Sequence, residues 1–214
     1  MNQHVEAIPS EKKNSKRPII SIWTAPRETI RHQMNHSKLG WLFLLAALAG
    51  ISYFLDSAST GNLADKANAS AGGIVLIGLF VGPVLGLISW VFFSAVYFGI
   101  GKLFGGESTF KEMLYAVAWS NIPIIASLLL WIPDLGIMGD GAFSQYLSDV
   151  NGFGVAIILF TSFLEIVLTV WYAVILVKGI AEAHQFSAWK GLGVIIVPSL
   201  FVLLLAILLI FVSA

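Results

Sequence analysis

One carboxylate stands inside an otherwise apolar stretch of this chain. Glu165 lies in the run from Val155 to Val177, and it is the only charged residue within any apolar run long enough to cross a membrane. An ionisable side chain near the middle of a bilayer costs roughly 2.5–3.5 kcal/mol on insertion scales, so such a residue is a functional candidate. A carboxyl group there can serve a transport path, or it can form a hydrogen bond that holds helices together.

Four polar residues stand at helical spacing from Glu165 and would form one polar stripe that faces the interior of a helical bundle: Thr161, Ser162, Thr169 and Tyr172. We therefore expect Glu165 to be buried and neutral, because no lysine, arginine or histidine lies within an apolar run to pair with it. Asn121 is the other strongly polar residue of such a run, next to the helix-breaking Pro123. The candidate intramembrane polar site consists of Glu165, Asn121, Ser162, Thr169 and Tyr172.

Enzyme motifs are missing from the sequence. It has no phosphate-binding loop, dinucleotide fingerprint, nucleophile elbow or pair of intramembrane aspartates. It also has no cysteine, which excludes disulfides and thiolate ligands. His32 and His36 have the i, i+4 spacing of a metal site, but Gln33 stands where the zinc proteases have glutamate. We expect no catalytic residue, no metal site and no cofactor.

The composition indicates a protein that lives in lipid. Hydrophobic residues make up 57% of the 214 residues and charged residues only 11%, against about 25% charged in soluble domains. So few charges cannot cover a surface in water. The 12 basic and 12 acidic residues balance, which argues against a nucleic-acid partner. The first partner we expect is therefore the lipid bilayer.

Five apolar runs approach or exceed the length of about 20 residues that a helix needs to cross a bilayer. A strict alternation of polar and apolar residues is absent, which argues against a barrel. Helices are the other structure that satisfies the backbone in lipid. The predicted fold class is all-α, a polytopic bundle of five transmembrane helices. The predicted spans are 39–55, 74–100, 113–132, 155–177 and 192–212.

The basic residues predict the orientation of these spans. With the N-terminus in the cytoplasm, only Lys66 of the 12 lysines and arginines falls on the external side. Because cytoplasmic loops carry an excess of lysine and arginine, this arrangement is strongly favoured over its reverse. We expect a multi-pass protein of the cell membrane with a cytoplasmic N-terminus and an external C-terminus at Ala214.

The chain divides into an N-terminal segment, residues 1–38, and a membrane domain, residues 39–214. Residues 1–17 are polar and charged, and we expect them to be disordered. Thr24 suits the cap of a short helix that begins near Pro26. We interpret this helix as an interfacial helix on the cytoplasmic leaflet, with an ordinary solvated linker as the alternative.

Gly78, Gly82 and Gly86 form a stripe of small residues in the second run. Small residues at this spacing let helix backbones approach closely. Two uses remain open, homo-oligomerisation through the second span and packing within the monomer. Thr109 and Glu112, at the start of the third run, have the spacing of a capping box.

Two segments carry a family resemblance. One is Gly105-Gly106-Glu107-Ser108-Thr109-Phe110-Lys111-Glu112, continuing to Trp119-Ser120-Asn121-Ile122-Pro123; the other is Trp23-Thr24-Ala25-Pro26-Arg27-Glu28-Thr29-Ile30-Arg31. The chain from about Trp23 onward resembles the Yip family, the Ypt-interacting proteins, and in particular its shorter prokaryotic branch. The resemblance implies five spans and a cytoplasmic N-terminus. Eukaryotic members resemble trafficking factors that engage Rab-type GTPases through a longer N-terminal region, which has no equivalent here, so the resemblance implies no partner.

We therefore expect a non-enzymatic integral membrane protein that acts through contacts with membrane proteins or lipids, or with a second copy of itself. The alternative is a small-solute or lipid permease with a polar path past Glu165. A second acidic residue that meets Glu165 in space would reopen the possibility of an enzyme.

Overall fold

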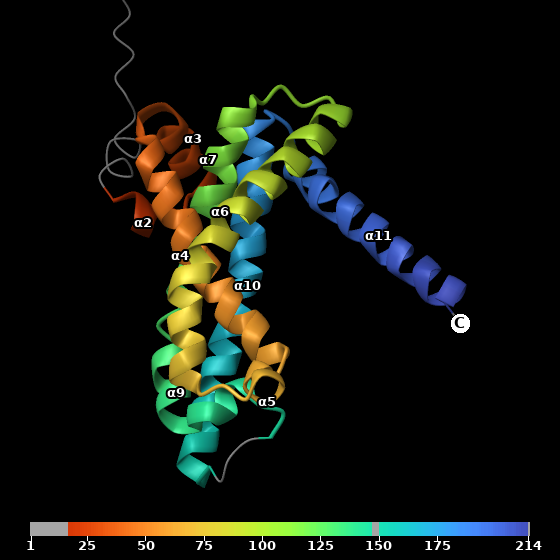
Figure 1. The fold of residues 1–214 in the computed structure, drawn as a ribbon. Helices are drawn as coiled ribbons and strands as arrows, with labels where there is room; N and C mark the ends of the chain where they lie inside the picture. The colour runs from red at the N-terminus through yellow and green to blue at the C-terminus, as the bar shows by residue number, and fades with distance from the viewer. Residues whose placement is uncertain (1–16, 147–149, 214) are drawn as a thin grey trace, which may run out of the picture. The chain divides into compact units, whose positions relative to one another are not determined.

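The computed structural model describes residues 17–146 and 150–213. The predicted disorder of the chain's beginning, up to residue 16, and the predicted location of Ala214 lie outside this described part. Every regular element in the described ranges is a helix, and five helical segments are long and apolar enough to cross a membrane. The prediction of an all-α protein with five spans is thus confirmed (Figure 1).

Most of the spanning helices are longer than the apolar runs that predicted them, because helical structure continues into the polar residues at their ends. Four of the spans are single helices, and shorter helices precede or connect them. The spanning helices are α4 (Leu39–Thr60), α6 (Ala71–Leu103), α10 (Gly152–Ala183) and α11 (Ala188–Ser213), and the shorter ones are α2 (Pro18–Ser21), α3 (Pro26–His36), α5 (Leu63–Ala67) and the 3-10 helix η1 (Gly139–Phe143).

The third span is broken into three helices, α7 (Phe110–Ser120), α8 (Ile122–Ser127) and α9 (Trp131–Met138). The predicted continuous run 113–132 therefore contains two interruptions. The first falls at Asn121, because Pro123 has no N–H to donate within the helix. The capping box that opens α7 is confirmed: the Thr109 N–H donates to Glu112 Oε2 at 2.7 Å, and the Glu112 N–H donates to Thr109 Oγ1 at 3.2 Å.

The described chain divides into two compact units. The basic unit (residues 17–37, 92–117 and 174–213) contains α2, α3, most of α7, the ends of α6 and α10, and α11. It carries seven of the nine described lysines and arginines. The acidic unit (residues 38–91, 118–146 and 150–173) contains α4, α5, α8, α9, η1 and the starts of α6 and α10, and it carries five of the nine described acidic residues.

The acidic unit has a small apolar core where its connecting segments meet. Phe143 of η1 is fully buried and stacks on Trp131 of α9, with ring centroids 5.3 Å apart. Leu55 of α4 and Ile74 of α6 belong to the same buried cluster. The Ser59 hydroxyl donates to the carbonyl of Ala142 at 2.7 Å and ties α4 to η1. These contacts hold α4, α6, α9 and η1 together in the acidic unit.

The basic unit contains α3, the longer of the two helices that precede the first span. This helix begins at Pro26, but the prediction that Thr24 caps it is wrong, since Ala25 holds the cap position and no side chain bonds the free N–H groups. Proline at the first position lacks an N–H and so removes one of the groups that a cap would satisfy. One face of α3 is buried by the protein itself, through Pro26, Thr29, Ile30 and Gln33.

Candidate functional site

Tyr53 of α4 joins two residues of the predicted polar site. Its hydroxyl donates to Asn121 Oδ1 at 3.3 Å, and it is also hydrogen-bonded to the hydroxyl of Tyr172 on α10. Asn121 is buried, at 5% exposure, in the break between α7 and α8. The structure therefore brings Asn121 and Tyr172 into one hydrogen-bonded group whose central member, Tyr53, the sequence did not single out.

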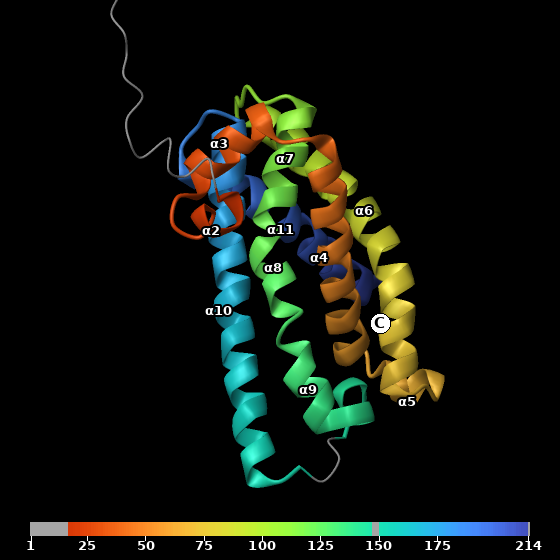
Figure 2. The ribbon, with the colours of Figure 1, turned by 90° about the vertical axis from the view of Figure 1, so that its left-hand side faces the viewer.

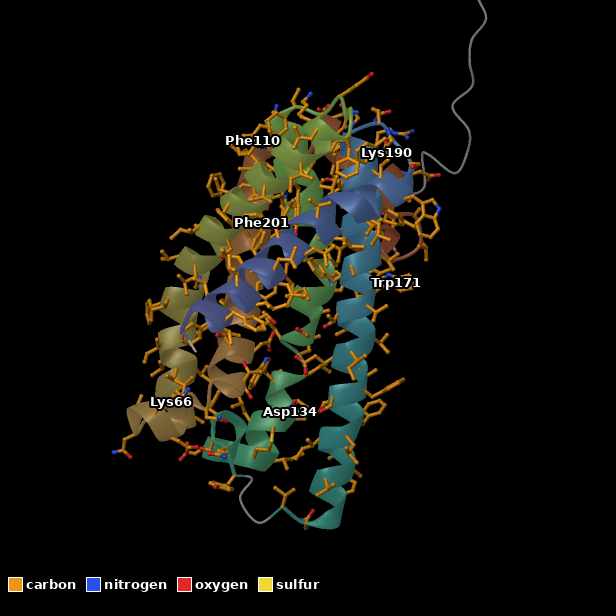
Figure 3. All side chains as sticks on the ribbon, turned by 90° about the vertical axis from the view of Figure 1, so that its right-hand side faces the viewer. Lys66, Phe110, Asp134, Trp171, Lys190 and Phe201 are labelled. Atoms are coloured by element: carbon orange, nitrogen blue, oxygen red, sulfur yellow. The ribbon has the colours of Figure 1, made fainter. Side chains whose placement is uncertain are left out.

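Two further carboxyl groups of the acidic unit lie near Glu165. Asp56 of α4 and Asp134 of α9 are both within electrostatic range of it. The Trp131 ring N–H donates to Asp56 Oδ1 at 3.1 Å, and the Thr161 hydroxyl donates to Asp134 Oδ1 at 2.7 Å. Figure 3 shows Asp134 on α9 beside α10. Glu165 thus has two carboxyl neighbours that the apolar runs did not reveal, so the condition for reconsidering an enzyme is met in part. The groups interact electrostatically, but the hydrogen bonds of the two aspartates go to Trp131 and Thr161.

The expectation that Glu165 is buried is wrong. Glu165 is exposed, and so are Ser162 and Thr169, whereas Thr161 is buried at 4% exposure. The reason lies in α10, which buries only 11% of its most apolar window. A helix with so few covering neighbours can place only a narrow strip of side chains inside the protein. Of the predicted polar stripe, Thr161 is buried and Tyr172 half-buried, whereas Ser162 and Thr169 face outward.

The three glycines of α6 lie against α4 within the acidic unit. A Cβ atom on Gly82 would lie 2.8 Å from Ile51 Cα, and one on Gly78 would lie 2.8 Å from the Phe54 ring. A Cβ on Gly86 would lie 2.7 Å from Gly50 Cα, so the two helices touch backbone to backbone. Packing within the chain, the second of the two uses considered for the stripe, covers this face of α6.

His184, which follows α10, is one of the most deeply buried polar side chains of the basic unit. It is 1% exposed, and its Nε2 lies 3.3 Å from the carbonyl oxygen of Tyr97 on α6. The Ser108 hydroxyl lies 3.0 Å from Nδ1, and the Glu107 N–H donates to the His184 carbonyl at 3.1 Å. Burial lowers the pKa of His184. A neutral ring that donates from Nε2 and accepts at Nδ1 satisfies all of this geometry.

Two glycines make room for the His184 ring. A Cβ atom on Gly101 would lie 2.5 Å from His184 Cδ2, and one on Gly106 would lie 2.6 Å from Cγ, so any larger residue would collide with the imidazole. Gly105 has φ +80°, a left-handed conformation that favours glycine. The Gly105-Gly106 pair, which helped to carry the family resemblance, is therefore explained by a turn and by a buried histidine.

The same stretch of chain holds α3 in place. Arg31 Nε donates to Glu182 Oε1 at 2.5 Å, where the glutamate side chain is 4% exposed and the arginine side chain 59%. Arg27 Nη2 donates to the carbonyl oxygen of Phe186 at 3.2 Å. Figure 2 shows α2 and α3 beside this end of α10. The residues from Glu182 to Phe186 therefore fasten α3 and, through His184, the loop before α7.

Sequence reasoning missed Glu182 and His184 because both stand at the edge of the fourth apolar run, where charged residues are ordinarily solvated. Their one signal is the alternation Ala181-Glu182-Ala183-His184, in which small residues separate the two polar ones and allow close approach. The other histidine pair, His32 and His36, stacks ring on ring at 4.2 Å. Among residues 17–146 and 150–213, no group of three or more His, Cys, Asp or Glu residues is placed to hold a metal ion.

Comparison with known proteins gives one match. The family model described as the Yip1 domain matches residues 20–210. No curated protein and no solved structure matches the chain. The matched region includes half of α2, all of α3 and nearly all of α11, so almost all of the described chain falls within the family domain. The chain belongs to the Yip1 domain family.

Proposed function

We propose that this membrane protein works without catalysis, as a contact protein of the cell membrane whose basic unit holds membrane proteins or lipids. One observation carries the proposal: α3 is fastened to the end of α10 by the Arg31–Glu182 pair and by Arg27 on the Phe186 carbonyl. Helices that merely link a polar tail to a first span have no need of such fixed contacts. A fixed α3 presents a constant surface to other molecules.

The outer face of α3 supports this proposal. Glu28, Asn35 and His36 are exposed, while Thr29, Ile30 and Gln33 on the other side are buried. Transient protein–protein interfaces are no more apolar than the rest of a protein surface, so a polar outer face suits a transient interaction.

The proposed orientation places this surface in the cytoplasm. Lysines and arginines concentrate in the basic unit and in the residues before it, and Lys66 is the one basic residue of the connection after α4. By the excess of basic residues on cytoplasmic sides, the N-terminus lies inside and the C-terminus outside. The motifs around Trp23 and Gly105 assign the chain to the shorter prokaryotic branch of the family.

The test is site-specific photocrosslinking in native membranes. Probes replace Glu28 and Asn35 on α3, and control probes replace Ser57 and Thr60, which are also exposed but belong to the acidic unit. We expect adducts to form preferentially at the α3 positions, and we expect Arg31→Ala to reduce them because it releases α3. Adduct yields that are the same at all four positions would contradict the proposal.

A permease is the second candidate, favoured by the polar group of the acidic unit. Tyr53, Asn121 and Tyr172 are linked by hydrogen bonds, and Glu165 has two carboxyl neighbours. Polar residues within spans often mark ion or proton paths. Liposomes that contain the purified protein and an internal pH dye test this candidate: a proton path predicts faster dissipation of an imposed pH gradient than with Tyr53→Phe, and equal rates with and without protein exclude it.

A further inference from the structure

Three lysines of the basic unit each stand next to a large exposed apolar residue. Lys102 precedes Leu103, which is 86% exposed; Lys190 follows Trp189, which is 82% exposed; and Lys111 follows Phe110, which is 38% exposed. All three lysines are exposed as well. We refer to these six residues as the rim.

Contacts gather the rim around the end of α6. Lys190 Nζ donates to the carbonyl oxygen of Phe104 at 3.1 Å, which ties the start of α11 to the residue after α6. Lys102 Nζ lies 5.6 Å from the centre of the Phe98 ring. The Phe98 ring packs edge-on against Phe110 of α7, with centroids 6.0 Å apart. Ends of three helices are thereby held together, and Figure 3 shows Phe110 and Lys190 at the same end of this unit.

Two acidic residues, Glu107 and Glu112, lie close to the rim in sequence and offset part of its charge. Glu112, the nearest acid in sequence to Lys111, is bound to the N–H and hydroxyl of Thr109 in the capping box. Glu107 is exposed and is the one other acid in the segment between α6 and α7. The three lysines outnumber these two glutamates, and the rim presents three cationic groups beside three apolar side chains.

We propose that the rim binds the headgroup of an anionic phospholipid, with the lysine ammonium groups on its phosphate and the apolar side chains at the top of its acyl chains. A headgroup fits because each lysine is adjacent in sequence to an exposed apolar side chain. This pairing of a cationic and an apolar group matches the membrane boundary, where lipid phosphates lie next to hydrocarbon. Each basic residue near an anionic leaflet strengthens binding by about fivefold. The inference rests on the proposed contact function and names lipid as the partner at this place.

The test is native mass spectrometry of the full-length protein in detergent, titrated with phosphatidylglycerol and, separately, with phosphatidylcholine. The triple variant Lys102→Gln, Lys111→Gln, Lys190→Gln removes the rim's charge. A control variant, Lys12→Gln, Lys13→Gln, Lys16→Gln, makes the same change of net charge elsewhere in the chain. We expect wild type and control to prefer phosphatidylglycerol, and we expect the rim variant to bind it at least about tenfold more weakly, with phosphatidylcholine binding unchanged.

Two results would overturn the inference. One is phosphatidylglycerol binding that survives in the rim variant or that falls equally in the control. The other is a photocrosslinking probe at Trp189 that captures protein rather than lipid in native membranes. Either result leaves adducts at Glu28 and Asn35 unaffected, so failure of the lipid site is distinguishable from failure of the contact function. If α3 forms no adducts but the protein still prefers phosphatidylglycerol through the rim, the proposal about α3 is wrong and the proposed lipid site stands.

Discussion

Replacing Gly86 with alanine should destabilise the acidic unit, because the new methyl group would clash with the backbone of α4. The Cβ atom would lie 2.7 Å from Gly50 Cα and closer still to the carbonyl oxygen of Ala46. Both are backbone atoms of α4, so no side-chain rotation relieves the contact. α4 and α6 would have to separate by about 1 Å, which forfeits a quarter to a half of the attraction at each van der Waals contact along the interface.

The magnitude follows from two opposing effects. Overpacking of this kind costs about 1–3 kcal/mol, and an unyielding backbone favours the upper end. Alanine in place of glycine inside a helix returns up to about 1 kcal/mol. We therefore expect Gly86→Ala to lower the free energy of unfolding by about 2 kcal/mol, and Gly50→Ala to behave in the same way, because its Cβ would lie 2.6 Å from Gly86 Cα.

Gly99→Ala is the matched control, since it makes the same chemical change in the same helix at a position with no atom within 4 Å of the new methyl group. It should gain the propensity term alone, so the two variants should differ by about 3 kcal/mol. The assay is unfolding in mixed micelles, followed by tryptophan fluorescence, with size-exclusion chromatography to verify the same oligomeric state. Equal stability of Gly86→Ala and Gly99→Ala would refute the backbone contact between α4 and α6.

Three other changes have distinct expected outcomes. Burial lowers the pKa of His184 in the folded protein, so the unfolded chain takes up a proton at a higher pH than the folded chain does. The free energy of unfolding should therefore fall as the pH drops below about 6.5 towards the folded pKa. His184→Gln should weaken this pH dependence in unfolding measured from pH 8 to 5. Arg31→Ala should destabilise more than Glu182→Gln, by about 1 kcal/mol, because it leaves a buried carboxylate without its cationic partner. Hydrogen exchange in α3 reports the difference, and equal exchange in both variants would refute it. Glu165→Leu should fold at least as stably as wild type because the side chain is exposed; a loss above about 1 kcal/mol would show a hidden partner.

The fold was predictable because lipid imposes a simple rule on sequence. Each span must be a helix with an apolar surface, so the run from Ile74 to Ile100 announces α6 without any knowledge of its neighbours. The capping box at Thr109 and Glu112 was equally readable, since it depends only on residues three apart. The features that could be predicted correctly are thus those that depend on the lipid environment or on residues close together in the chain.

The polar groups were harder to predict because their partners lie far away in sequence. Tyr53 and Asn121 are 68 residues apart, and Arg31 and Glu182 are 151 apart. Hydropathy also hid Asp56 and Asp134, which stand just beyond the ends of apolar runs yet lie within helices of the spanning segments. Burial of Glu165 was wrongly predicted because amphipathic reasoning assumes a helix with covered flanks, and α10 has few.

The position of Glu165 on α10 connects these observations. Thr161 and Tyr172 are 11 residues apart, about three helical turns, so both project from one face, and Glu165 falls within about 40° of that face. This is the face that binds Asp134 through Thr161 and Tyr53 through Tyr172, yet Glu165 between them is exposed. A carboxyl group on a polar face, with no basic residue in the apolar runs, destabilises the isolated protein unless water or a partner's donor reaches it. Glu165→Leu therefore separates stability from function. If the variant is more stable, keeps its α3 adducts, and neither it nor the wild type conducts protons, Glu165 is a lipid-exposed residue without a role in transport. If the variant is more stable but the proton flux of the wild type is lost, Glu165 belongs to a proton path.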